Sequence, residues 1–244
     1  MPESLTLNRH NMAGAASRTI ARACLLIAVL LIISCGTTLV KPDYQMPHAL
    51  ITPVTAHVGL VLDSELLGYH HDETRAGTDW SIDLGSGTAR MWEDIFKAAF
   101  TEVRVFKSLD EAVAASDGLQ ALAQPRVDQY SFATNRETTG EHWAATVRYR
   151  LGVFSPSGQL VDSLTLSGYG NSYDDGGAKE SLIHATRAAM RDASAKFLVQ
   201  MPRQPIAARL ASGQVIDAPT SPVLTADVIE AVPIEAPQGV RPAP

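Results

Sequence analysis

The strongest constraint on the fold is residues 142–153, where apolar and polar side chains alternate. One face carries Trp143, Ala145, Val147, Tyr149, Leu151 and Val153, and the other carries His142, Ala144, Thr146, Arg148, Arg150 and Gly152. This alternation is typical of a strand with one packed and one wet face, as in an antiparallel sheet. The turn residues Ser155-Pro156-Ser157-Gly158-Gln159 follow, and residues 160–169 then return as the second strand of a hairpin.

Two amphipathic segments indicate helices that cover such a sheet. The first has an aromatic face of Met91, Trp92, Ile95, Phe96, Ala99 and Phe100, with Thr88 as its expected N-cap. The second runs over 179–200 with an inner stripe of Leu182, Ile183, Thr186, Ala189, Met190, Ala193 and Phe197. Further strands are predicted at 58–62 (central), 80–84 (a short edge strand), 103–105 and 126–133, with loops over 65–78 and 168–177. The predicted class is α+β, a two-layer sandwich whose mostly antiparallel sheet has two main helices packed on one face.

The N-terminal region has the features of a targeting signal for export. An uncharged apolar run of eleven residues, 23–33, follows Arg18 and Arg22 and ends in Ser34-Cys35-Gly36. It covers about half of a bilayer core, and its flanks are typical of a secretory signal. The stretch Ile32-Ile33-Ser34-Cys35 resembles the lipobox of bacterial lipoproteins, which implies cleavage before Cys35 and its lipidation. A signal anchor or ordinary cleavage is the alternative interpretation, and translation begins at Met1 or Met12.

The lipobox resemblance carries further expectations. Gly36 is not the Asp that favours inner-membrane retention in lipoproteins of enteric type, so the chain is expected on the periplasmic face of the outer membrane. Lipoproteins carry two or three acyl chains, which anchor stably where one chain does not. Cys24 leaves with the leader and Cys35 bears lipid, so the mature chain has neither a free thiol nor a disulfide.

Composition divides the chain into four segments. The lipobox resemblance implies that residues 1–34 are a signal peptide and that 35–55 form a lipidated tether, in which Pro42, Pro47 and Pro53 break any helix. Residues 56–201 are long enough to bury one core. Residues 202–244 hold eight of the fourteen prolines and no aromatic residue, which predicts a disordered tail. Within it, residues 206–210 are expected to extend the preceding structure a little.

The order of these elements resembles a known class. The lipobox, the first strand His57-Val58-Gly59-Leu60-Val61-Leu62-Asp63, the hairpin turning on Pro156-Ser157-Gly158-Gln159-Leu160 and the closing helix together resemble lipoproteins of the TolB amino-terminal-domain/CsgG class. PelC, LptE and YajG lipoproteins share related two-layer architectures. The resemblance implies a role in secretion or envelope assembly, often through oligomeric rings or a partner barrel, and it carries no catalytic motif. The expected partners are the membrane through Cys35 and an envelope protein, with a homo-oligomer left open.

Three segments invite a ligand-binding interpretation. Gly85-Ser86-Gly87-Thr88-Ala89-Arg90 lacks the third glycine of a dinucleotide loop, so a turn followed by a helix is favoured. His70-His71-Asp72-Glu73 offers four metal-ligand types, with His57, His142 and His184 as distant candidates, but neighbouring side chains point oppositely. Asp174-Asp175-Gly176-Gly177 lacks the spacing of a calcium loop. We therefore predict neither a cofactor nor a metal.

Catalytic signatures are absent from the sequence, including the nucleophile elbow and the P-loop. Arg126, Arg136, Arg148 and Arg150 could form a basic stripe, but the net charge of −6 weighs against nucleic acid. The favoured function is that of a non-enzymatic scaffold or accessory subunit in envelope assembly or export. The alternative is a periplasmic hydrolase or ligand-binding lipoprotein that uses the His70-His71 loop and the Tyr169–Tyr173 loop.

Overall fold

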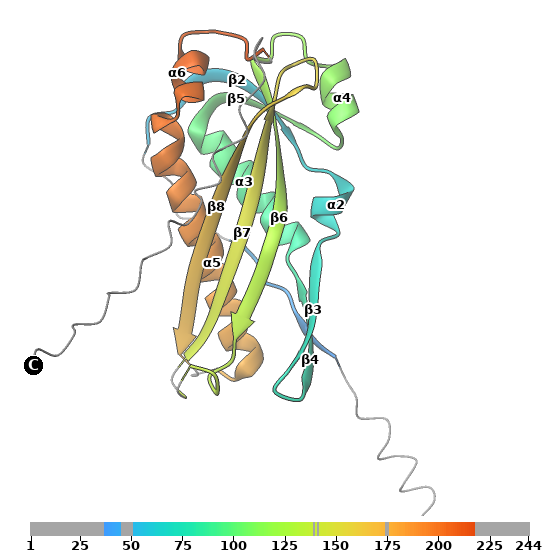
Figure 1. Cartoon of the computed structure of the whole chain (residues 1–244), viewed down its shortest axis with the longest axis vertical. Helices are drawn as coiled ribbons and strands as arrows, with labels where there is room; N and C mark the ends of the chain where they lie inside the picture. Colours follow the sequence, from blue (N-terminus) through green and yellow to red (C-terminus); the bar gives the residue numbers. More distant parts are fainter. Residues whose placement is uncertain (1–36, 45–50, 139, 141, 174–175, 218–244) are drawn as a thin grey trace, which may run out of the picture.

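The computed structural model describes residues 37–44, 51–138, 140, 142–173 and 176–217 (Figure 1). The expected leader, Cys35, Asp174 and Asp175 and the chain after Asp217 lie outside these residues. No helix within the described ranges is long and apolar enough to cross a membrane.

The main sheet has five strands in the order β5-β2-β6-β7-β8. The central strand β2 (Val54–Val61) pairs in parallel with β5 (Phe100–Phe106) and β6 (Ala121–Ala133). A long antiparallel meander joins β6 to β7 (His142–Phe154) and β8 (Leu160–Tyr173). The predicted central strand, hairpin and α+β class are confirmed.

Two helices, α3 (Gly85–Ala99) and α5 (Ala178–Gln200), cover one face of this sheet, as predicted (Figure 1). Between them and the sheet lies an aromatic core in which the Trp92 ring meets those of Phe96, Tyr149 and Phe197 at 5.5–6.0 Å. All six residues predicted to face inward on β7 are buried. The short helix α4 (Leu109–Ala114) packs a second, smaller core on the opposite face, built from Val61, Phe106, Ala112, Leu119 and Leu122.

A small second sheet, in the order β1-β4-β3, lies beside the helices. It consists of β1 (Thr38–Val40), β4 (Thr78–Asp83) and β3 (His70–Arg75). Trp80 anchors it to the main sheet, because its ring meets Phe132 at 5.8 Å and Trp143 at 5.4 Å.

The small sheet corrects two predictions. The loop expected over 65–78 is helix α2 (Ser64–Leu67) followed by β3, whose polar side chains gave no apolar alternation to recognise. β4, the strand expected at an edge, is instead the middle strand of the small sheet, because β3 pairs with one of its sides and β1 with the other.

The glycines at the end of β8 lie in a strand and not in the predicted loop over 168–177. The strand continues to Tyr173, and α5 crosses it at backbone contact. A Cβ atom on Gly168 would lie 2.0 Å from the Ala189 carbonyl oxygen, and one on Gly170 would lie 2.2 Å from that of Ala185. Glycine in a strand often marks such a close approach rather than a break.

The start of α3 also differs from the prediction. The helix begins at Gly85, and Thr88 is a fully buried residue inside it rather than the N-cap. A Cβ atom on Gly85 would lie 2.0 Å from the Leu67 carbonyl oxygen, and one on Gly87 would lie 2.6 Å from that of Pro42. These glycines therefore admit neighbouring backbone instead of a phosphate.

Residues on both sides of the predicted domain pack onto it. Within the expected tether, Thr38–Val40 form β1, and the buried Tyr44 hydroxyl donates a 2.8 Å hydrogen bond to Ser194 Oγ. Beyond Met201 the chain forms η1 (Met201–Arg203) and α6 (Pro205–Ala211), and Ile216 is fully buried. A few apolar side chains suffice to hold both segments, so residues 38–44 are not a free tether and residues 202–217 are not a free tail.

Candidate functional site

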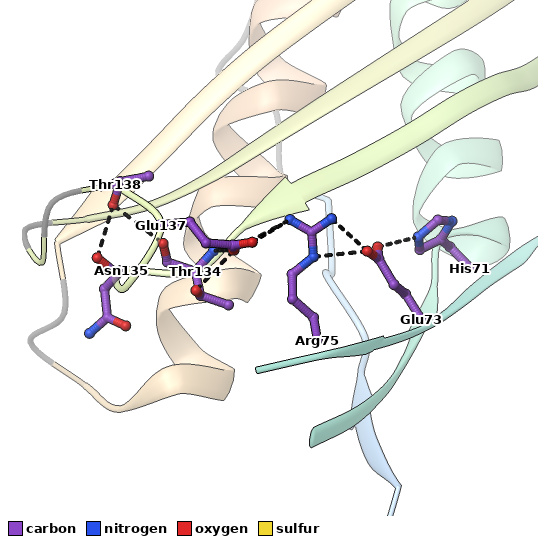
Figure 2. A network of polar contacts seen from close by, with 7 residues as sticks. All are labelled: His71, Glu73, Arg75, Thr134, Asn135, Glu137 and Thr138. Carbon is purple, nitrogen blue, oxygen red and sulfur yellow. Dashed lines mark hydrogen bonds and ion pairs between the residues drawn. The ribbon is translucent and has the colours of Figure 1, made fainter. Parts of the chain in front are cut away.

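A polar network joins the small sheet to the loop after β6 (Figure 2). The alternation of β3 turns His71, Glu73 and Arg75 toward the main sheet, while His70, Asp72 and Thr74 are exposed on the outer face. His71 Nε2 lies 3.1 Å from Glu73 Oε2, and Arg75 Nε donates to Glu73 Oε1 at 2.8 Å. Three consecutive inward side chains of β3 are thus linked along the strand.

Arg75 also bridges the two sheets. Its Nη1 donates to both carboxylate oxygens of Glu137, at 3.2 and 3.3 Å. Glu137 Oε2 accepts further hydrogen bonds from the Thr134 amide at 2.8 Å and the Thr134 hydroxyl at 2.9 Å. The Thr138 hydroxyl lies 3.4 Å from the carbonyl oxygens of Thr134 and Asn135, which tightens the same loop.

Aromatic rings lie under this network. The Arg75 guanidinium lies 5.0 Å from the centre of the Phe132 ring, and the His71 ring meets Tyr130 edge-on at 5.2 Å. Tyr130 in turn shares a 2.7 Å hydrogen bond with Thr186 of α5. The network is therefore continuous with the contact between the main sheet and α5.

The network keeps its carboxyl groups ionised. Burial raises the pKa of Glu73, but hydrogen bonds from His71 and Arg75 outweigh burial and leave that pKa below its ordinary value. The Thr134 amide lowers the pKa of Glu137, assisted by the Thr134 hydroxyl and Arg75. Burial raises the pKa of the Tyr130 phenol, which stays neutral.

This arrangement joins three structural elements: β3, the loop after β6 and the aromatic rings beneath them. Both carboxylates already accept several hydrogen bonds and have lowered pKa values, so each is a weak base, including Glu137 beside the Thr134 hydroxyl. Buried hydrogen bonds to charged groups are worth about 1.5–3 kcal/mol each, and partly exposed ones less. We infer that the network locks the small sheet in place.

A large hollow among the described residues lies along the small sheet. It is an open trough of about 470 Å³ lined by Thr37, Asp72, Glu73, Thr74, Asp79, Trp80 and Ser81. Its wall is polar and acidic, and its N-terminal edge is Thr37, two residues after Cys35. Under α6 lies a much smaller apolar cavity of about 20 Å³.

The histidine candidates do not converge on one site. His70 pairs with Asp72 at 3.5 Å on the outer face of β3, whereas His71 pairs with Glu73 on the inner face. His57 lies on β2 beside Glu102, at 3.5 Å. Across the described ranges, no three His, Cys, Asp or Glu residues come together in a way that could hold a metal ion.

The basic stripe is neutralised by an acidic residue at a bulge. The register of β6 shifts between Val127 and Gln129, and Asp128 lies at that irregularity. Its carboxylate accepts from Arg148 Nε at 2.8 Å and from Arg150 Nη2 at 3.1 Å. Arg126 instead pairs with Glu65 at 2.8 Å. The open face of the meander is thus polar but not uniformly basic.

The two loops of the alternative function are strands on different sheets. His70 and His71 lie on β3 of the small sheet, whereas Tyr169 and Tyr173 are exposed on β8, at the edge of the main sheet. The free side of β8 is partly occupied by α5, because the Tyr169 amide donates to Asp192 at 2.9 Å and Lys196 donates to the Ser167 carbonyl oxygen at 2.8 Å.

Three positioning residues, Arg75, Glu137 and Gln120, are not marked by any sequence motif. Arg75 and Glu137 lie 62 positions apart. The only signal for Arg75 is that it follows His71 and Glu73 at alternate positions, as on one face of a strand, and Glu137 has no such signal. Gln120 accepts from the His57 amide at 3.0 Å and donates to the Leu210 carbonyl oxygen at 2.9 Å, which holds α6 against β2. No sequence pattern marks a single glutamine with that role.

No family model and no curated protein matches this chain. Several solved structures are similar to it. One is protein XCC0632 from Xanthomonas campestris, described as belonging to the family model DUF330. It is 11% identical to this chain, and the match covers 72% of this chain and 100% of XCC0632, with a TM-score of 0.48. A proposed neuraminyllactose-binding hemagglutinin homolog from Helicobacter pylori is 9% identical over 71% and 97%, with a TM-score of 0.46. A PelC dodecamer from Paraburkholderia phytofirmans is 17% identical over 58% and 91%, with a TM-score of 0.31.

Proposed function

We propose that this chain is a lipoprotein of the bacterial envelope, anchored through Cys35 on the periplasmic face of the outer membrane. Its domain acts by binding and positioning, as a scaffold or accessory subunit in envelope assembly or export, and not by catalysis. The mature protein comprises the anchor, the two-sheet domain and the proline-rich segment after Asp217.

The observation that carries this proposal is the place of β1. Thr38 lies three residues after Cys35, and β1 is hydrogen-bonded into the small sheet. The polar network and Trp80 then connect that sheet to the main one. A lipid on Cys35 would therefore hold a rigid body at the membrane, which suits a protein that positions a partner.

Two further features favour binding over catalysis. The carboxylates of the polar network already accept several hydrogen bonds, and the large trough is open to solvent. The second feature is the face of β6–β8 that α3 and α5 do not cover. It presents exposed polar side chains, among them Thr146, Arg148 and Ser167. Such a face is available to an envelope protein or to a second copy of this chain.

Two cysteine variants test the anchor. Cys35→Ser should abolish incorporation of radiolabelled palmitate and release the protein from the outer-membrane fraction, whereas Cys24→Ser, the matched control in the leader, should retain both. Equal labelling of the two variants would refute the anchor. Crosslinking in intact envelopes should then recover a protein partner. Recovery of none, together with hydrolysis of a cell-wall substrate by the purified protein, would refute the scaffold role.

A further inference from the structure

We propose that the short anchor holds one end of the domain against the lipid headgroups of the membrane. This basal end comprises residues 75–78 of the β3–β4 turn, residues 134–138 after β6 and residues 171–173 of β8, which lie at the same end of the molecule (Figure 1). The inference rests on the proposed function, because it requires a lipid on Cys35.

The register of β1 sets the direction in which the chain leaves the domain. β1 runs parallel to β4, with Thr38 opposite Trp80 and Val40 opposite Ile82. Because β4 starts at Thr78, directly after the β3–β4 turn, the first residue of β1 lies next to that turn. The chain that leads back to Cys35 therefore departs from the basal end.

Chain length then limits how far this end can move from the membrane. Only Gly36 and Thr37 separate Cys35 from β1, and a span of three residues reaches at most about 10 Å. The 13 residues of β7 extend over about 44 Å. The anchor thus reaches only about a quarter of the length of the domain. It is too short to let the domain reverse so that the opposite end, which carries α6, faces the bilayer.

The domain would follow its anchor as one body. The small sheet is held to the main sheet by the Arg75–Glu137 ion pair and by the Trp80 ring contacts. Asp43, just after β1, accepts a 2.7 Å hydrogen bond from Arg90 of α3, and its carbonyl oxygen accepts one of 2.7 Å from Arg187 of α5. The segment that leads to the anchor is thus tied to both helices and to both sheets.

The chemistry of the basal end suits a zwitterionic headgroup. Arg136 is exposed at this end and can face a lipid phosphate, whereas the neighbouring Glu137 already pairs with Arg75. Tyr173 is 69% exposed, and tyrosine is a residue typical of membrane interfaces. The net charge of −6 gives no attraction to a strongly anionic surface. We therefore assign the contact to zwitterionic lipid.

A fluorescent label on an introduced thiol tests this orientation. Ala76→Cys labels the basal end and Ala211→Cys the far end of α6; both alanines are exposed, and the processed chain offers no other free thiol if Cys35 is lipidated. The lipidated full-length variants are reconstituted into vesicles of phosphatidylcholine and phosphatidylethanolamine with a headgroup quencher. We expect loss of fluorescence at position 76 and none at position 211.

Mass spectrometry of Cys35 separates the two proposals. An unmodified Cys35 refutes the proposed function and this orientation together. A lipidated Cys35 with equal quenching at both positions, or with stronger quenching at 211, refutes the orientation alone.

Two further arms test the cause of the contact. A flexible twenty-residue Gly-Ser insertion between Gly36 and Thr37 should remove the difference between the two labels; an undiminished difference would contradict the role of the short anchor. Replacing part of the lipid with phosphatidylglycerol should leave quenching at position 76 unchanged, and a clear gain would contradict the assignment to zwitterionic headgroups.

Discussion

The five-stranded sheet and the three-stranded sheet differ in what holds them in the domain. The main sheet is joined to α3 and α5 by interlocking aromatic rings and by glycines that admit helix backbone. The small sheet buries fewer apolar side chains, chiefly Val40, Trp80 and Ile82, and it depends in addition on ion pairs and hydrogen bonds around Arg75.

This difference has consequences for cooperativity and for pH response. Apolar burial stabilises by about 25 cal/mol per Å² and is insensitive to the protonation of side chains, so the main sheet should unfold only with the whole domain. Partly exposed ion pairs contribute about 1 kcal/mol or less each and depend on pH and salt. The small sheet is therefore expected to open locally before the main sheet does.

The largest effect should come from truncating the aromatic core. Phe197→Ala removes a ring that is 1% exposed and stacks on Phe96 at 5.5 Å, and it should lower the free energy of unfolding by about 3–5 kcal/mol. Urea denaturation with an unchanged m-value measures this loss. Val199→Ala, an exposed position on the same helix, should change stability by less than about 0.5 kcal/mol. Similar losses in both variants would contradict the aromatic core as the main source of stability.

The glycine contact between β8 and α5 should have the next largest effect. Gly168→Ala places a methyl group 2.0 Å from the Ala189 carbonyl oxygen, so the helix must shift, at a cost of about 2–3 kcal/mol. Ser167→Ala, the adjacent and exposed position, serves as the control and should be nearly neutral. A neutral Gly168→Ala in thermal unfolding would show that α5 does not approach the strand this closely.

The same contrast explains which parts of the fold could be predicted from the sequence. The alternation of residues 142–153 and the stripe of the last helix are apolar patterns of many residues, and both were predicted correctly. Gly168 and Gly170 were misread because glycine marks either a turn or a close backbone approach, and only the partner decides which. β3 was missed because a polar strand held by a neighbouring strand carries no signal of its own.

The candidate site was harder to predict for the same reason. The sequence offers His71 and Glu73 as possible metal ligands, an interpretation that was not favoured, and it does not reveal the contact of His71 with Tyr130 or of Arg75 with Glu137, which depend on how distant segments pack. Glu137 joins them from a loop 62 residues after Arg75. Polar pairs of this kind are specified by three-dimensional register, which a single sequence does not reveal.

Removing the cation of the network should loosen the small sheet alone. Arg75→Met leaves Glu73 and Glu137 without their ion pair and should cost about 1–2 kcal/mol. Amide hydrogen exchange should rise in β3 and β4 and stay unchanged in β7. Lys97→Met breaks one exposed ion pair on α3 and should cost about 0.3–0.5 kcal/mol. Faster exchange in β7 of the Arg75→Met chain would mean that the two sheets open together.

The smallest effect is a pH response confined to the network. The pKa values of Glu73 and Glu137 are lowered in the folded chain, so their contribution to stability is complete above the unfolded-state pKa of about 4.3 and is lost as the pH falls below it. Hydrogen exchange in β3, corrected for the intrinsic pH dependence of amide exchange, should therefore accelerate as the pH falls below about 4.3. Glu73→Gln/Glu137→Gln should remove this acceleration. Asp192, whose pKa is lowered chiefly by Lys196 and the Tyr169 amide against the opposing effect of burial, should still give β8 an acid response in that variant. An acid response of β3 that survives both substitutions would assign the pH sensitivity of the small sheet to groups outside the network.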